Sequence, residues 1–135
     1  MSADQDFAAL CLTSNRYVRC IPAFAYCFTR YWPDQVVHLG CYDELPEIGT
    51  FPGNWPTFSL GKQAETSWSL GLLRALELLG STTFVALFFE DHWLCEYVAM
   101  QRIDRILDHM RRHSDVGKVD LTGDRLRFPH TEYRR

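Results

Sequence analysis

Short apolar runs alternate with amphipathic segments along most of the chain. Runs rich in aliphatic and aromatic residues have the length of buried β-strands, whereas apolar residues spaced three and four apart indicate helices. The expected strands are 7–12, 36–42, 57–60, 82–89 and 118–121. The expected helices are 21–32, 67–79 and 98–112. A loop rich in proline and glycine separates the second strand from the third, and the polar segment 122–135 is expected to be irregular.

Strands that alternate with helices of this length predict the α/β fold class. We expect a mostly parallel, Rossmann-like sheet of about five strands with helices on both faces, formed by residues 1–135 as a single domain. Pro22 suits the first turn of the first helix, and Gly80 suits the position after the second. Segment 82–89 is expected to be the most buried strand because it is rich in β-branched and aromatic residues.

Composition narrows the class of protein. Of 135 residues, 47% are apolar and 23% are charged, which is typical of a globular domain and excludes a disordered chain. The formal charge of −3 gives no general attraction to nucleic acid, and no apolar run is long enough to span a membrane. The polar, acidic N-terminus does not resemble a signal peptide. Five widely spaced cysteines without a C-x-x-C pair predict small buried thiols, and therefore a cytoplasmic protein.

Glu90, Asp91 and His92 follow directly after an apolar strand. Placing charges next to a buried strand costs free energy unless a partner offsets it. A divalent cation is one such partner, since Mg²⁺ prefers oxygen ligands and a histidine suits Mn²⁺ better. The alternative is that these residues simply end the strand or cap the next segment.

The first expected strand is followed by Thr13, Ser14, Asn15 and Arg16, which offer hydroxyl, amide and guanidinium groups. Such a loop can hold a nucleotide base or a phosphate, or it can be a plain turn. It lacks the glycines of the two common nucleotide-binding motifs. His109 and His113 have the spacing of a zinc-binding pair, but the neighbouring arginines favour a solvated helix end. Trp55 is either a lid residue or a partner contact.

Three stretches together carry a resemblance to a known family. They are LTSNRYVRCIPAFAYCFTRYW, SWSLGLLRALELLGSTTFVALFFEDHWL and KVDLTGDRL, and they cover about residues 7–125. In element order and short motifs they resemble the nucleotide-sugar half of GT-A type glycosyltransferases. Trp68-Ser69 and Glu90-Asp91-His92-Trp93 match the family's W-S pair and acidic metal motif. That motif usually reads Asp-x-Asp, and here His92 occupies its third position. The family also has an acceptor-binding half, which we expect to come from elsewhere.

The resemblance implies a role for each candidate residue. Thr13, Ser14, Asn15 and Arg16 would contact the base, ribose or phosphate of a nucleotide-sugar donor, with Tyr42 and Asp43 near the base or ribose. Asp91, with Glu90 or His92, would hold Mn²⁺ or Mg²⁺ across the diphosphate. The metal would act as a Lewis acid for the departing nucleoside diphosphate. No general base is implied, because the acceptor side is absent.

Three functional hypotheses follow from the sequence. The first is a nucleotide-diphospho-sugar-binding, glycosyltransferase-like domain, either catalytic or degenerate. The second is a non-enzymatic α/β interaction protein that forms a homodimer, because a fold without its second half would expose apolar surface. The third is a small α/β enzyme of another type, in which Asp91 and His92 act as an acid–base pair.

Overall fold

The computed structural model describes residues 6–121, so the expected irregular segment 122–135 lies outside the described residues. The contacts divide the chain into two compact units, one up to Val98 and the other from Ala99 onward. The first unit contains the sheet and two helices. The second contains the helix α3 (Met100–Arg112), which begins two residues later than the sequence predicts. Each unit is described by itself.

Four parallel strands form the sheet of the first unit. They are β1 (Phe7–Leu12), β2 (Val37–Cys41), β3 (Thr57–Ser59) and β4 (Phe84–Phe89). Their order across the sheet is β3-β2-β1-β4, and every neighbouring pair runs parallel. The predicted α/β class with a parallel sheet is confirmed. The expected number of about five strands is wrong, because residues 118–121 form no strand. These residues belong to the second unit, whereas all four strands belong to the first.

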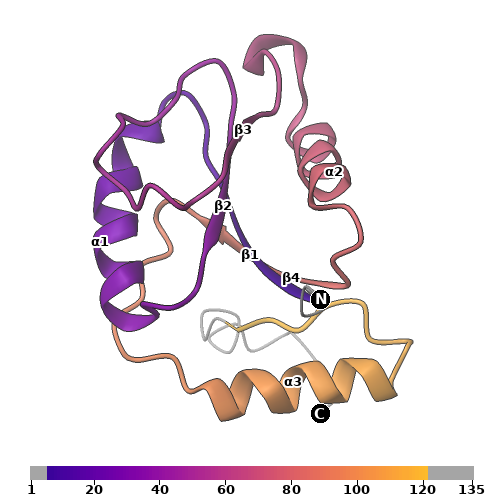
Figure 1. The fold of residues 1–135 in the computed structure, drawn as a ribbon. Helices are drawn as coiled ribbons and strands as arrows, with labels where there is room; N and C mark the ends of the chain where they lie inside the picture. Colours follow the sequence, from indigo (N-terminus) through magenta and orange to yellow (C-terminus); the bar gives the residue numbers. More distant parts are fainter. Residues whose placement is uncertain (1–5, 122–135) are drawn as a thin grey trace, which may run out of the picture. The chain divides into compact units, whose positions relative to one another are not determined.

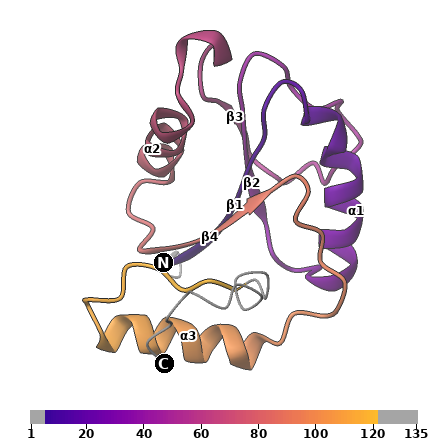
Figure 2. The same cartoon turned by 180° about the vertical axis from the view of Figure 1, so that it is seen from behind.

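Two helices cover opposite faces of the sheet (Figures 1 and 2). α1 (Ile21–Tyr31) has Pro22 in its first turn, as predicted, and follows the short 3₁₀ segment η1 (Val18–Cys20). α2 (Trp68–Leu79) follows a second 3₁₀ segment, η2 (Gln63–Glu65). Ser67 caps α2, since its Oγ accepts the amide N–H of Leu70 at 3.3 Å. Gly80 ends α2 with a φ of 65°, in the left-handed region that glycine adopts at little cost.

The face under α1 is an aromatic core. Phe24 and Phe28 of α1 are fully buried, and both rings pack against Phe88 of β4 and Trp55 of the β2–β3 loop. The centroid separations lie between 5.4 and 6.2 Å. Trp55 is therefore a core residue, and the sequence-based choice between a lid and a partner contact was wrong. Its indole fixes the long loop against α1.

The face under α2 is an aliphatic core. Leu10 and Leu12 of β1, Tyr42, Leu60 and Ala75 are buried together there. Gly71 allows the close approach of α2, because a Cβ at that position would collide with the Tyr42 hydroxyl. The alternation of Phe88 toward α1 and Phe89 toward α2 is the two-residue period of a strand covered on both faces.

β1, not β4, is the most buried strand. Residues 8–12 of β1 are all buried, whereas every residue of β4 is intermediate in exposure or exposed. The reason is the strand order, which places β4 at the edge of the four-stranded sheet with β1 as its neighbour. High hydrophobicity therefore did not indicate a central position.

The cysteines are less uniformly buried than the sequence predicts. Cys11 and Cys41 are buried, Cys20 and Cys27 are intermediate, and Cys95 is exposed. Cys95 follows β4 in a segment without regular structure, where flanking apolar residues do not imply burial. Among residues 6–121, no helix is long and apolar enough to cross a membrane.

Candidate functional site

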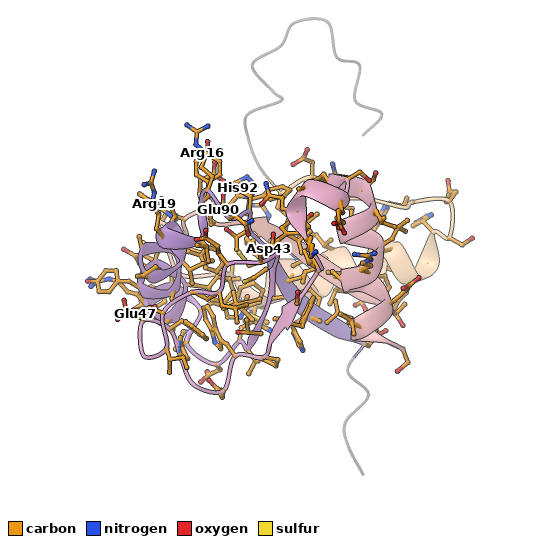
Figure 3. All side chains as sticks on the ribbon, turned by 90° about the horizontal axis from the view of Figure 1, so that it is seen from above. Arg16, Arg19, Asp43, Glu47, Glu90 and His92 are labelled. Atoms are coloured by element: carbon orange, nitrogen blue, oxygen red, sulfur yellow. The ribbon has the colours of Figure 1, made fainter. Side chains whose placement is uncertain are left out.

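The strand order reverses between β1 and β4, and we use the word crevice for the region at the carboxyl ends of these two strands. From β1 the chain moves through α1 to β2 on one side, and it returns later to β4 on the other side. Ligands of open parallel sheets bind where the strand order reverses in this way, outside the carboxyl ends. Leu12 pairs with Phe89, so the next residues, Thr13 and Glu90, follow neighbouring strands at the same level. Figure 3 looks onto this end of the sheet and labels Arg16, Asp43, Glu90 and His92 there.

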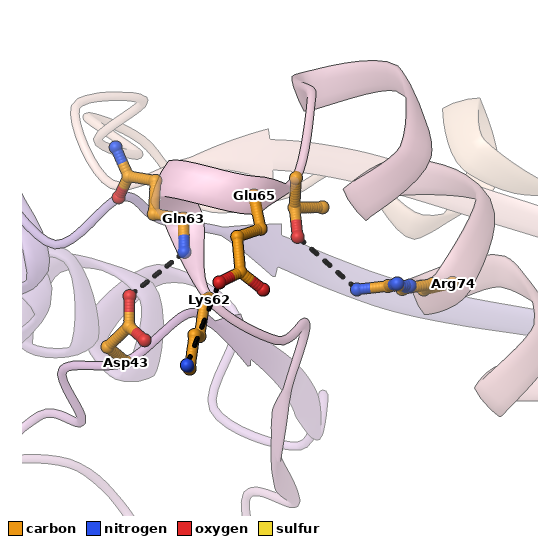
Figure 4. Close-up of polar contacts among 6 residues, drawn as sticks. Asp43, Lys62, Gln63, Glu65 and Arg74 are labelled. Atoms are coloured by element: carbon orange, nitrogen blue, oxygen red, sulfur yellow. Dashed lines mark hydrogen bonds and ion pairs between the residues drawn. The ribbon is translucent and has the colours of Figure 1, made fainter.

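A hydrogen-bonded network joins the loops that follow β1, β2 and β3. The Asn15 side-chain amide donates to Asp43 Oδ2 at 2.9 Å, and Asn15 Oδ1 accepts the N–H of Glu44 at 3.0 Å. The main-chain N–H of Asn15 donates to Gln63 Oε1 at 2.7 Å, and that of Gln63 donates to Asp43 Oδ2 at 2.9 Å (Figure 4). The structure thus brings together Asn15 and Asp43, two residues that the sequence singled out.

The network stabilises the charged form of one carboxylate. The Asn15 side chain, followed by the Gln63 amide, lowers the pKa of Asp43 below its usual value. Gln63 and Glu44 were missed by the sequence analysis. Gln63 begins the short η2 segment and Glu44 lies in the loop after β2, and no spacing or motif distinguishes either residue.

A second set of contacts holds the loop after β3 against α2. Arg74 Nη1 donates to the carbonyl of Leu60 at 2.6 Å and to Thr66 Oγ1 at 3.3 Å, and Lys62 and Glu65 form an exposed ion pair at 3.7 Å (Figure 4). Arg74 is an exposed residue of α2, and these two bonds anchor the segment that carries Gln63.

The rest of the loop after β1 is partly buried and partly open. Thr13 is buried, and its N–H donates to the carbonyl of Gly40 at 3.0 Å, which continues the ladder to β2. The Ser14 carbonyl accepts the N–H groups of Tyr17 and Val18, which turns the chain into η1. Arg16 is exposed, with its guanidinium 5.3 Å from the centre of the Tyr17 ring. Within residues 6–121, Arg16 forms no ion pair, so its charge is available to an anion.

Tyr42 lies in the core instead of at the mouth of the crevice. Its ring is buried against α2 beside Gly71, and burial raises the pKa of its hydroxyl. Its packing explains its position fully. A contact with a base or ribose, as the resemblance implies, stays a prediction.

Glu90 is the most unusual residue of the crevice. Only 8% of its surface is exposed, yet among the described residues its carboxylate makes no hydrogen bond or ion pair. The negative charges of Glu90 and Asp91 add to the effect of burial in raising the pKa of Cys11, a buried thiol near the end of β1. Both carboxylates therefore lie close to that strand. No buried side-chain oxygen of residues 6–121 lacks a hydrogen bond, so the unpaired oxygens of Glu90 reach solvent, where a cation or a ligand donor can meet them.

His92 has its ring tied to the strand end. Its Nδ1 accepts the N–H of Phe89 at 3.3 Å, and the two rings lie edge to face 5.2 Å apart. Residues 6–121 contain no group of three His, Cys, Asp or Glu side chains that could hold a metal ion. Binding of a cation by Glu90, Asp91 or His92 therefore stays a prediction.

The histidine pair of the second unit is separate from this site. The rings of His109 and His113 lie 4.4 Å apart at the exposed end of α3. This position agrees with the solvated helix end favoured by the sequence.

Comparison with protein-family models, with curated proteins and with solved structures finds no match to this chain. Its function is therefore inferred from the residues of the crevice.

Proposed function

We propose that the chain binds a nucleotide-diphospho-sugar at the crevice between β1 and β4, as a glycosyltransferase-like domain. The observation that carries this proposal is Glu90, a residue with only 8% exposure whose carboxylate has no protein partner among the described residues, at the point where the strand order reverses. Its carboxylate oxygens reach solvent, so a ligand at the strand ends can pair with them.

The loops on either side of Glu90 suit the parts of such a donor. Arg16 offers a guanidinium without an acidic partner, which fits a phosphate. Asn15 and Asp43 hold each other in place, so they form a fixed edge for a ribose or base. Ser14, which is partly exposed, adds a hydroxyl group, whereas the Thr13 hydroxyl is buried and donates to the Ser14 carbonyl at 3.4 Å.

A divalent cation, Mg²⁺ or Mn²⁺, completes the proposal. Glu90 and Asp91 would hold it together with oxygens of the diphosphate, as is usual for Mg²⁺ in nucleotide sites. When bound, the cation neutralises charge on a departing nucleoside diphosphate. Glu90 and Asp91 orient the cation, and Arg16 steadies the diphosphate. Transfer to an acceptor would be a further step that needs an acceptor-binding surface.

The test measures the Tm of the chain by thermal unfolding in the presence of UDP, GDP, CDP or dTDP or their sugars. Each ligand is tested once with Mn²⁺ and once with EDTA. A ligand at 100 times its Kd adds about 2.7 kcal/mol, which raises the Tm of a domain of this size by several degrees. We expect a rise with one nucleotide family, and only when the cation is present.

Glu90→Gln sharpens this test because it keeps the shape and removes the charge. Without ligand, the variant should unfold close to the parent, because the two side chains have nearly the same shape and the carboxylate oxygens of Glu90 reach solvent. With nucleotide and Mn²⁺, it should show no shift. Glu77→Gln, on α2 at an exposed position, is the matched control and should behave like the parent. Parent-like nucleotide binding by Glu90→Gln would contradict the proposal.

A second candidate function is homodimerisation through α2. Four leucines of this helix, Leu70, Leu73, Leu76 and Leu78, belong to the exposed large apolar residues. An apolar helix surface of this kind is typical of an interface. Oligomeric state in solution tests this candidate.

A further inference from the structure

A shallow depression of about 390 Å³ lies on the first unit, where the segment after β4 passes α1. Its wall consists of the rings of Tyr26 and Tyr31 and the guanidinium of Arg30 from α1, with the indole of Trp93 from the later segment. We call these four residues the Trp93 platform. None of them belongs to the nucleotide site proposed above.

Two of the three aromatic side chains of the platform are exposed, and Tyr31 is half-buried. Tyr26 is 65% exposed and Trp93 is 53% exposed. Tyr97, a third exposed ring, packs edge to face against Tyr31 at 5.6 Å. Exposed aromatic surface that gathers in one place marks a binding site more often than exposed single residues do.

Specific contacts hold the platform in place. The indole N–H of Trp93 donates to the carbonyl of Glu90 at 2.9 Å, and the N–H of Val98 donates to the carbonyl of Tyr31 at 3.1 Å. These two bonds fix both ends of the segment 93–98 on the first unit. A ligand that covers the rings therefore meets a surface whose backbone is already positioned, which reduces the entropy lost on binding.

Arg30 gives the platform a charge. Its Nη1 donates to the hydroxyl of Tyr26 at 3.4 Å, and its guanidinium lies 5.6 Å from the centre of the Tyr31 ring. In the described part of the chain Arg30 has no acidic partner. Its remaining N–H groups are free to donate to an anion, and a carboxylate matches their fork geometry.

We propose that the Trp93 platform binds a saccharide that carries a carboxylate. The depression is too open to enclose an apolar ligand, so its occupant must cover the rings on one side and remain hydrated on the other. A pyranose ring has this character, with an apolar C–H face and a rim of hydroxyl groups. The unpaired charge of Arg30 selects an acidic sugar over a neutral one.

The platform adjoins the proposed donor site through the bond from Trp93 to the Glu90 carbonyl. A saccharide bound there would be placed as an acceptor. That role rests on the proposed function, whereas saccharide binding does not depend on it. The two are separated by measuring saccharide binding in EDTA without nucleotide.

The experiment titrates the full chain with a tetramer of galacturonate and with the corresponding neutral tetramer of galactose, using calorimetry. We expect the acidic tetramer to bind with a Kd of about 1 mM and the neutral tetramer about tenfold more weakly. Trp93→Ala should raise the Kd for the acidic tetramer at least tenfold. Trp68→Ala is the matched control, because Trp68 has the same 53% exposure but lies on α2 and outside the depression.

Charge selection is tested separately. Arg30→Gln should bind both tetramers equally, while the control Arg19→Gln, an exposed residue of η1, should keep the preference. The proposal is overturned if neither tetramer binds at about ten times the expected Kd. It is also overturned if Trp68→Ala weakens binding as much as Trp93→Ala does. Tighter binding of an aromatic acid such as phenylacetate would likewise exclude a saccharide as the intended ligand.

Discussion

At the scale of single residues, the crevice separates two kinds of polar side chain. Asn15 and Asp43 satisfy each other and the surrounding backbone, so they fix the loops after β1 and β2. Glu90 is buried and lacks any such partner among the described residues. Asn15 and Asp43 therefore hold the loops of the site in place. Glu90 is the residue with which a ligand can form a new interaction.

The Asp43 network predicts a pH-dependent contribution to stability. Because the pKa of Asp43 is lowered in the folded chain, its contribution is complete above the unfolded pKa of about 3.9 and is lost as the pH falls through the folded value. The difference in Tm between the parent and Asp43→Asn should therefore be largest near pH 6 and shrink below about pH 4. Thermal unfolding across this range measures it. Asp34→Asn removes an exposed carboxylate without a hydrogen bond in residues 6–121 and is the control. A difference that does not change with pH would contradict this role.

At the scale of elements, α2 depends on one close approach to the sheet. Gly71→Ala would improve helix propensity by about 1 kcal/mol, but its methyl group would collide with the buried hydroxyl of Tyr42. Because the ring has little room to move, we expect a net loss of about 1–3 kcal/mol in unfolding free energy. Chemical denaturation measures this loss. Tyr42→Phe combined with Gly71→Ala should recover part of it, and Gly53→Ala, where a Cβ meets open space, should be nearly neutral. Equal stability of Gly71→Ala and the parent would show that α2 can shift away.

The local sequence pattern predicted where helices and strands lie along the chain better than it predicted their places in the fold. The cap at Ser67, the proline in α1 and the glycine after α2 are local signals, and the structure places the helices accordingly. The prediction that β4 is the most buried strand was wrong, because hydrophobicity does not reveal the order of strands across a sheet. The role of Trp55 was wrong for a similar reason, since only the folded chain shows that a loop indole packs against Phe24 and Phe28.

The candidate site was predicted in part. Asn15 and Glu90 were singled out because polar residues after apolar strands collect at one end of a parallel sheet, which is a consequence of topology. Asp43 was named only through the resemblance. The partner Gln63 comes from a segment 48 residues away from Asn15, and no pattern in the chain connects the two. The contact of the His92 ring with its own strand could not be predicted either, because a motif gives the order of residues and not the orientation of a side chain.

At the scale of the whole molecule, the exposed leucines of α2 decide between a monomer and a self-associating chain. Leu73 is 57% exposed in the middle of this surface. A stable interface buries about 1,200–2,000 Å² in total, so a lysine at its centre would leave a charge desolvated between the two copies. If α2 is the interface, the parent should sediment as a dimer at tens of micromolar and Leu73→Lys as a monomer, with the parent's secondary structure retained.

The control for this prediction is Ile48→Lys, which introduces the same charge at a loop residue that is 93% exposed. It should remain dimeric. A parent that sediments as a monomer throughout would contradict dimerisation through α2 and would leave nucleotide binding and saccharide binding untouched. The two proposals concern different surfaces, since the crevice lies at the strand ends and the leucines lie on a helix. Leu73→Lys should therefore keep any nucleotide-dependent rise in Tm, and losing both properties together would instead indicate that dimerisation completes the crevice.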